Sequence, residues 1–189
     1  MDCSYKGTHG TTWSAADTIK ASGFNSGVGI RGTGVYFWSY RLEALLEEAE
    51  RLAVAWYNVE LRRHRYNSHA EKNCAVILAD LNTSENGVFD FERQRQPFMA
   101  YALEIQKKLE SDKDLSDDER KNYYSALYDR FVEHWEEKAK SSFDAVLVRV
   151  PTPPRYTSPL GIDVASQPEC IVVRNSNIIG ITSIKKLNV

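Results

Sequence analysis

The sequence of 189 residues has few of the features that would indicate a disulfide framework, a metal site or a membrane anchor. Its three cysteines, Cys3, Cys74 and Cys170, are an odd number without C-x-x-C spacing, so no disulfide framework or zinc site is predicted. Residues 1–6 lack the apolar core of a signal peptide, and no apolar run approaches the length of a membrane span. We therefore expect a cytoplasmic protein that contacts no membrane and binds no metal.

An excess of charge of one sign is also missing. The formal net charge is −2 at pH 7, which argues against a strongly basic nucleic-acid binder but is compatible with a local basic patch. Residues Arg62–Arg65 form one such cluster, which either contacts nucleic-acid phosphate or is simply solvated at a helix end. His64, His69 and His134 have no metal-ligand spacing, and no G-x-G-x-x-G fingerprint indicates a Rossmann route to a dinucleotide.

What the sequence does contain is a series of short apolar strands interspersed with helices, which indicates an α+β domain. With 42% apolar and 26% charged residues, the composition is typical of one globular domain. The segment Ala75–Leu81 has little polarity, so it is expected at the centre of a sheet. The other predicted strands are Tyr5–His9, Val35–Trp38, Asp144–Val150, Cys170–Arg174 and one or two between Ile178 and Leu187.

Two helices and a loop are predicted in the first third of the chain. A helix is expected over Ser14–Ser22, opened by a capping-box pattern with Asp17 and followed by Gly23 at the C′ position. Four glycines within Asn25–Gly34 indicate a loop. Apolar residues at three- and four-residue spacing then predict a long helix over Arg41–Arg65.

Residues 97–140, called the arm below, are predicted to form a helical hairpin inserted between core strands. Residues 100–140 hold 8 Lys and Arg against 11 Asp and Glu, and Ser116-Asp117-Asp118-Glu119 is a strong capping box for the second helix. The stripe of apolar residues on that helix either covers one edge of the sheet or recruits an acceptor or a partner, such as an antitoxin or chaperone. The stripe consists of Tyr123, Tyr124, Leu127, Tyr128, Phe131, Val132 and Trp135.

Three short segments each put a polar or aromatic residue at the edge of a predicted strand. They are Gly7-Thr8-His9-Gly10, Gly32-Thr33-Gly34-Val35-Tyr36-Phe37-Trp38 and Gln167-Pro168-Glu169-Cys170-Ile171-Val172-Val173. A histidine, a tyrosine and a carboxylate suit a nucleotide whose sugar needs hydrogen bonds and whose base needs a stacking surface. Cleavage of a nicotinamide–ribose bond passes through an oxocarbenium-like state, which a nearby negative charge stabilises.

In this order, the three segments resemble those of the histidine–tyrosine–glutamate class of ADP-ribosyltransferases, which includes diphtheria toxin and the poly(ADP-ribose) polymerases. The resemblance covers most of the chain outside the arm. It implies one catalytic domain over residues 1–189 with the ADP-ribosyltransferase-like fold, split antiparallel β-sheets flanked by helices, here with the inserted helical hairpin. It further implies a mono-ADP-ribosyltransferase that uses NAD as co-substrate to modify a nucleic acid or a protein. By analogy with single-domain relatives, we expect a toxin of a bacterial toxin–antitoxin or phage-defence system.

The same resemblance assigns roles to five residues. Glu169 is expected to bind the nicotinamide-ribose 2′-hydroxyl and to stabilise the oxocarbenium, and Tyr36 to stack on the nicotinamide ring. His9 is expected to bind the adenosine-side ribose. The backbone of Gly10 is expected to pair with the nicotinamide amide, because a glycine permits close approach, and Thr11 completes this cofactor-binding segment.

A second aromatic residue usually closes the stack on the nicotinamide in these enzymes. Eleven residues after the first tyrosine this chain has Glu47, so the usual spacing fails. Tyr57 or Trp56 is the favoured substitute, with Tyr40 as a further candidate.

Two polar residues have weaker assignments. Arg31, in the glycine-rich loop, either contacts the NAD pyrophosphate or is a solvated loop residue. Gln167 is expected to position the acceptor, together with a polar loop that precedes Glu169 from Arg155 onwards.

Two other functions stay open. An NAD-dependent RNA 2′-phosphotransferase-like enzyme has the same fold, although the positions of Tyr36 and Glu169 fit it poorly. The chain is alternatively a catalytically silent module that binds NAD or a partner. For an enzyme we expect His9, Tyr36 and Glu169 to face one another across a single pocket. Tyr36 in the core, on the sheet face opposite His9, would end the NAD interpretation and make the silent module the better account.

Overall fold

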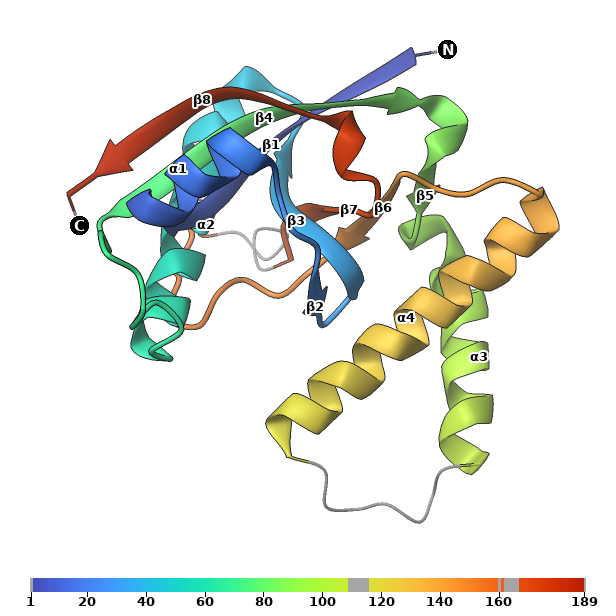
Figure 1. Ribbon diagram of the computed structural model, residues 1–189. Helices are drawn as coiled ribbons and strands as arrows, with labels where there is room; N and C mark the ends of the chain where they lie inside the picture. The colour runs from blue at the N-terminus through green and yellow to red at the C-terminus, as the bar shows by residue number, and fades with distance from the viewer. Residues whose placement is uncertain (1, 109–115, 160, 162–166, 189) are drawn as a thin grey trace.

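A computed structural model describes residues 2–108, 116–159, 161 and 167–188. Over these residues the chain forms an eight-stranded sheet and four α-helices (Figure 1). The helices are α1 (Trp13–Ser22), α2 (Leu46–Arg62), α3 (Arg95–Lys108) and α4 (Asp117–Ala139). The strands are β1 (Asp2–Thr12), β2 (Gly27–Gly29), β3 (Gly32–Tyr40), β4 (Cys74–Ser84), β5 (Val88–Asp90), β6 (Ala145–Arg149), β7 (Glu169–Val173) and β8 (Ile179–Leu187).

The expected α+β class is confirmed, and the sheet is mixed. Its strand order is β5-β6-β7-β3-β1-β4-β8, with β2 paired to β3. The expectation of wholly antiparallel pairing was wrong at one edge, where β5 runs parallel to β6. This is possible because the arm lies between those two strands in sequence and provides the long crossover that a parallel pair needs.

A short seam between β1 and β3 joins the two parts of the sheet. β1 pairs with β4 along its whole length, from Asp2 to Thr12. It pairs with β3 at only three positions, where Lys6, Gly7 and Thr8 lie opposite Tyr40, Ser39 and Trp38. We call these three pairs the β1–β3 seam. Beyond it both strands continue through described residues without pairing to each other, so the expected division into two sheets is observed only as a divergence past the seam.

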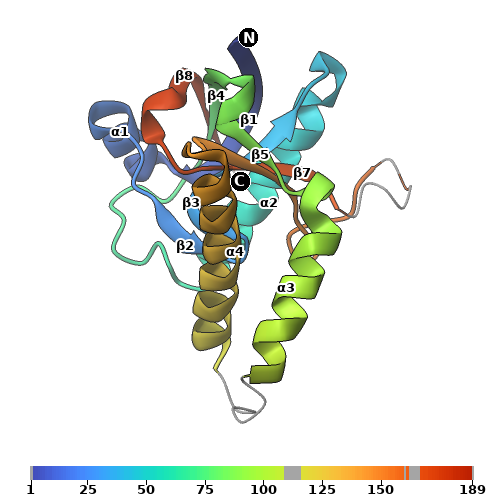
Figure 2. The ribbon, with the colours of Figure 1, turned by 90° about the vertical axis from the view of Figure 1, so that its right-hand side faces the viewer.

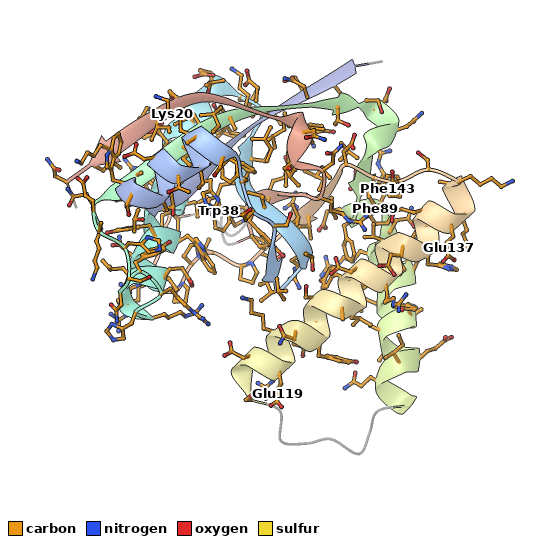
Figure 3. All side chains as sticks on the ribbon, viewed as in Figure 1. Lys20, Trp38, Phe89, Glu119, Glu137 and Phe143 are labelled. Atoms are coloured by element: carbon orange, nitrogen blue, oxygen red, sulfur yellow. The ribbon has the colours of Figure 1, made fainter. Side chains whose placement is uncertain are left out.

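Side chains alternate between two faces of the sheet because the strand period is two residues. Trp38, which is labelled in Figure 3, packs with Val172 against Ala53 of α2, and we call this side the α2 face. Phe37 and Ile171 point to the other side, which we call the Phe37 face. On β4, residues 74–79 are buried on both faces, as the apolar run predicts. The strand is internal but not central, because it lies next to the edge strand β8.

Two local predictions near the first helix were wrong. The N-cap of α1 is Thr12 rather than Ser14, and its side chain accepts a hydrogen bond from the Ala15 backbone. Gly23 does stand at the C-terminal cap, with φ 82°. The glycine-rich segment is not only a loop, because Gly27–Gly29 pairs with Gly32–Gly34 as the β2–β3 hairpin.

The predicted long helix is shorter than expected. A 3-10 turn, η1 (Glu43–Leu45), precedes α2, which ends at Arg62. Three more 3-10 turns, η2 (Glu85–Gly87), η3 (Glu92–Gln94) and η5 (Ser176–Ile178), connect the later strands.

In the arm, α3 and α4 lie side by side and extend away from the sheet (Figures 1 and 2). The predicted capping box is confirmed, with the Ser116 and Glu119 side chains each bonded to the other residue's backbone N–H. Between the helices the rings of Phe98 and Tyr128 lie 4.5 Å apart. Where the arm meets the sheet, the rings of Phe89 and Phe143 lie 5.1 Å apart (Figure 3).

Most of the predicted apolar stripe on α4 is buried. Leu127, Tyr128, Phe131 and Val132 are each 7% exposed or less, whereas Tyr124 is 45% exposed. The stripe therefore mainly packs against α3 and the edge of the sheet. Among the helices of the described residues, none combines the length and the apolar character that a membrane crossing requires.

Candidate functional site

The three segments singled out in the sequence lie on neighbouring strands. His9 is on β1, Tyr36 on β3 and Glu169 at the start of β7, and these strands are adjacent in the order β7-β3-β1. β3 pairs with β7 over four residues, from Val35 opposite Val173 to Trp38 opposite Cys170. Sheet pairing thus gathers the three segments although they come from the start, the first quarter and the end of the chain.

His9 stands directly after the β1–β3 seam, on the Phe37 face. Its ring packs against Phe24 and Phe37, with centroids 5.3 and 5.8 Å away. Burial lowers the pKa of His9, so the imidazole is neutral near pH 7. Its Nδ1 atom lies 2.9 Å from the backbone oxygen of Tyr36. Because a carbonyl oxygen only accepts, Nδ1 carries the proton and Nε2 remains an acceptor.

Tyr36 lies on the α2 face, opposite His9. Thr8 pairs with Trp38, so the β1 position on the same face as Tyr36 is Gly10, and His9 shares its face with Phe37. The Tyr36 hydroxyl donates to the Gly32 backbone oxygen at 2.7 Å and accepts from the Arg31 backbone N–H at 3.0 Å. Burial raises the pKa of Tyr36 above its usual range. The expectation that His9, Tyr36 and Glu169 face one pocket was therefore wrong for Tyr36.

Glu169 is on the same face as His9, towards the other end of the seam and level with Ser39. Ser39 Oγ donates to its Oε1 at 2.9 Å, and Arg41 donates through Nε at 3.3 Å and through Nη2 to Oε2 at 3.2 Å. Its side chain is 30% exposed. The strand β3 lies between Glu169 on β7 and His9 on β1, and the two residues are offset by two positions along the strands. Two strand spacings and this offset put their Cα atoms about 12 Å apart. The two residues are thus near each other without contact, with Phe37 between them.

The other expected cofactor-binding residues have identifiable structural partners. A Cβ on Gly10 would lie 1.9 Å from the backbone oxygen of Ala53, so Gly10 is needed for close packing of α2 against β1. The Thr11 side chain is buried near Tyr66. Tyr57 is buried, donates to the Lys72 backbone oxygen, and stacks on Tyr66 with centroids 5.6 Å apart.

The three candidates for a second stacking aromatic residue, Tyr57, Trp56 and Tyr40, differ in burial. Tyr57 already uses one ring surface on Tyr66 and is 2% exposed. Trp56, the next residue along α2, is 39% exposed. Tyr40 is buried on the α2 face, in the same core cluster as Trp38.

Arg31 and Gln167 differ in how they are held. The Arg31 guanidinium stands over the ring of Tyr128 at 5.1 Å, and its Nε donates to the Arg149 backbone oxygen at 3.3 Å. Arg31 is therefore anchored to α4 and β6 rather than solvated. Gln167 is exposed and lies two residues before the start of β7. The predicted acceptor loop falls partly on residues 160 and 162–166, outside the described residues.

Sequence reasoning missed Ser39 and Arg41, which hold the carboxylate of Glu169. A signal was available, because the two-residue strand period puts Phe37, Ser39 and Arg41 on one face. Their contact with Glu169 depends on the pairing of Trp38 with Cys170, and that register could not be read from the sequence.

Two cavities on the described surface lie away from these residues. One, of about 330 Å³, lies between α2 and Leu187. The other, of about 570 Å³, lies between α4 and the β2–β3 hairpin and has Thr33, Asp129 and Arg174 in its wall. Neither is lined by His9, Tyr36 or Glu169. Within the described residues no group of three or more His, Cys, Asp or Glu side chains is placed to hold a metal.

Comparison of the chain with protein-family models, with curated proteins and with solved structures finds no match in any of the three.

Proposed function

We propose that the protein is an NAD-dependent mono-ADP-ribosyltransferase that modifies a nucleic acid or a protein. The observation that supports this most is the adjacency of β1, β3 and β7, which brings the His-Gly, Gly-Val-Tyr-Phe and Pro-Glu-Cys segments onto neighbouring strands. The divergence of β1 from β3 past the seam is compatible with the split sheets of an ADP-ribosyltransferase-like fold.

The environment of His9 suits a sugar-binding role. Its neutral imidazole donates through Nδ1 to the Tyr36 carbonyl, which leaves Nε2 to accept a hydrogen bond from a ribose hydroxyl. NAD has two riboses separated by a pyrophosphate, so a residue that binds one need not touch the residue that acts on the other. The separation of His9 from Glu169 is therefore compatible with one extended dinucleotide.

Glu169 would supply the chemistry at the nicotinamide ribose. A carboxylate beside C1′ stabilises the positive charge that develops as the bond to nicotinamide breaks. Ser39 and Arg41 hold the Glu169 carboxylate in one orientation, which lowers the cost of orienting it in the transition state. Arg41 also offsets its charge, so the substrate has to share or displace that arginine.

Tyr36 would border the ligand only through the opening past the seam. The Nδ1–carbonyl bond holds the His9 ring against the Tyr36 backbone, so the two residues are in contact although their side chains point to opposite faces. Past the seam β1 and β3 are unpaired, and Tyr36 is half-buried rather than enclosed in the core. Of the ring pairs within the described residues, none includes Tyr36, which leaves its ring without an aromatic partner.

A silent module that binds NAD or a partner is the second candidate. The position of Tyr36 opposite His9 is the observation that favours it, together with the pairing of Glu169 with Arg41. Such a module would bind NAD or another protein without cleaving the nicotinamide bond.

One experiment separates the two candidates. The protein is incubated with cell lysate and NAD labelled in its adenylate part, and the products are treated separately with protease and nuclease. Label that becomes macromolecular and is released by one treatment supports the transferase and identifies the acceptor class. No transfer and no release of nicotinamide, with NAD binding still measurable by calorimetry, would establish the silent module.

A role as the toxin of a toxin–antitoxin or phage-defence system is part of this proposal. The arm is its candidate docking element for an antitoxin or chaperone. Most of the α4 stripe is buried, but Met99 and Leu103 on α3 are each 55% exposed, and Tyr124 on α4 is 45% exposed. Replacing Met99 and Leu103 with Ser should abolish neutralisation by such a partner and leave NAD cleavage unchanged.

A further inference from the structure

One peptide group at the start of β3 is held from both ends by side chains. The Gly32 carbonyl accepts from the Tyr36 hydroxyl at 2.7 Å. The Thr33 N–H of the same peptide group donates to the Asp129 carboxylate, with oxygen distances of 2.9 and 3.1 Å. Thr33 Oγ1 also donates to Asp129 Oδ2 at 2.8 Å. Asp129 belongs to α4 of the arm, so a helix 96 residues away in sequence holds this turn.

The turn is shaped to receive that carboxylate. Gly32 has φ 104°, a backbone conformation that favours glycine, and a Cβ there would lie 2.7 Å from Asp129 Oδ1. Only a glycine therefore permits both the turn and the approach of Asp129. The carboxylate accepts two hydrogen bonds from Thr33, and charge-assisted bonds of this kind are stronger than neutral ones.

A second contact links the arm to the same hairpin. The Arg31 backbone N–H donates to the Tyr36 hydroxyl at 3.0 Å. The Arg31 side chain stands over Tyr128 of α4 at 5.1 Å. Gly29 on β2 leaves the space for the Tyr36 hydroxyl, because a Cβ there would lie 2.2 Å from it. The hydroxyl is thus enclosed by a hairpin that two consecutive α4 residues contact.

We propose that Asp129 is a positioning residue for Tyr36, so that the arm sets the position of the tyrosine. A peptide group is planar and rigid, so a rotation that breaks the Thr33–Asp129 bond also turns the Gly32 carbonyl away from Tyr36. Displacement of α4 would then release the tyrosine hydroxyl. The consequence for NAD rests on the proposed function, in which Tyr36 borders the nicotinamide.

Amide hydrogen exchange tests the coupling without any assay of activity. In Asp129→Ala we expect the Thr33 amide to exchange faster, because it loses its acceptor. We also expect the Arg31 amide to exchange about tenfold faster, as for the loss of one hydrogen bond. This amide bonds to the Tyr36 hydroxyl and not to Asp129, so its faster exchange would report the coupling. The reciprocal variant Tyr36→Phe should accelerate both amides.

Glu133→Gln is the matched control, since Glu133 lies one turn further along α4 and pairs with Arg130 instead of the hairpin. Asp129→Asn keeps the size of the side chain and one acceptor oxygen, so it should show the same pattern at smaller amplitude and serves if the alanine variant does not fold. Acceleration of Thr33 alone, with Arg31 within twofold of the wild type, would overturn the proposal.

An NAD titration separates this inference from the proposed function. If the wild type binds NAD, Asp129→Ala should weaken binding by about tenfold, equivalent to about 1.4 kcal/mol, and Glu133→Gln should not. Unchanged affinity together with faster Arg31 exchange would mean that Asp129 positions Tyr36 but that Tyr36 lies outside the NAD site. A wild type that binds no NAD refutes the proposed function, while the exchange data still decide the coupling.

Discussion

The two ends of the β1–β3 seam differ in polarity and exposure. At one end Glu169 is partly exposed and paired with Arg41, whose guanidinium lies 5.8 Å from the centre of the Tyr5 ring. Burial, with a hydrogen bond to Cys3, raises the pKa of Tyr5 to about 12. At the other end His9 is neutral and packed against Phe24 and Phe37.

This difference separates the roles that the two ends can fill. A carboxylate can stabilise a developing cation, whereas the half-buried imidazole of His9, with Nε2 as an acceptor, suits binding and orienting a hydroxyl. Changes at the charged end should therefore alter turnover, and changes at the buried end should alter folding and affinity. Four predictions test or sharpen this contrast.

The largest effect is expected for Glu169→Gln. Its charge acts mainly in the oxocarbenium state, so kcat should fall by about 100-fold or more, equivalent to about 2.7 kcal/mol. The Kd for NAD should stay within about tenfold. Steady-state kinetics and calorimetric titration measure the two quantities, with the exposed Glu47→Gln as control. An unaltered kcat would remove Glu169 from the chemistry.

At the buried end, Gly10→Ala should destabilise the fold. The new Cβ would meet the Ala53 backbone oxygen, and α2 has to shift because no side chain can move aside. We expect the free energy of unfolding to fall by about 2 kcal/mol, as measured by urea denaturation. Gly180→Ala is the control, since its Cβ would lie 3.5 Å from Asp80. A stable Gly10→Ala protein that no longer binds NAD would instead assign the glycine to the ligand.

The stability of the protein should depend on the protonation of His9. Burial lowers the folded pKa of His9 below its unfolded value of about 6.5. The contribution of neutral His9 to the free energy of unfolding is complete above the unfolded pKa of about 6.5. It is lost as the pH falls from there through the folded pKa. In that window the slope approaches about 1.4 kcal/mol per pH unit. Urea denaturation at several pH values should show this component in the wild type and not in His9→Gln.

The smallest effect is expected for Arg41→Ala. Its pair with Glu169 is largely exposed on the arginine side, and exposed ion pairs contribute little. The free energy of unfolding should fall by about 0.5 kcal/mol, and the difference from wild type should shrink in high salt. A salt-independent loss several times larger would show that the charged end also supports the fold.

Much of the fold could be predicted because it follows from local physics. The burial of β4 on both faces was evident from its unbroken apolar run, and the capping box of α4 from Ser116 and Glu119. Errors arose where two local signals competed. Thr12 rather than Ser14 caps α1, because β1 continues to Thr12 and delivers that side chain to the Ala15 N–H.

The candidate site could be predicted only in part. Glu169 was correctly placed at the start of a strand, whereas His9 lies inside β1, which continues to Thr12. The strands β1, β3 and β7 are neighbours. Ser39 and Arg41 were missed, and most of the α4 stripe proved to be packing surface for Phe98 and Phe91. An amphipathic pattern shows that a surface becomes buried, but not which part of the chain covers it.

The sequence by itself determined which residues of each strand share a face, since the period of two is a property of the backbone. It therefore determined that Tyr36 and Trp38 point one way and Phe37 the other. Only the tertiary structure decided which of them shares a face with His9. That depends on the pairing of Thr8 with Trp38, and a slip by one residue would exchange the two faces. The register is set by packing against α2, β4 and β7, which involves residues far apart in the chain.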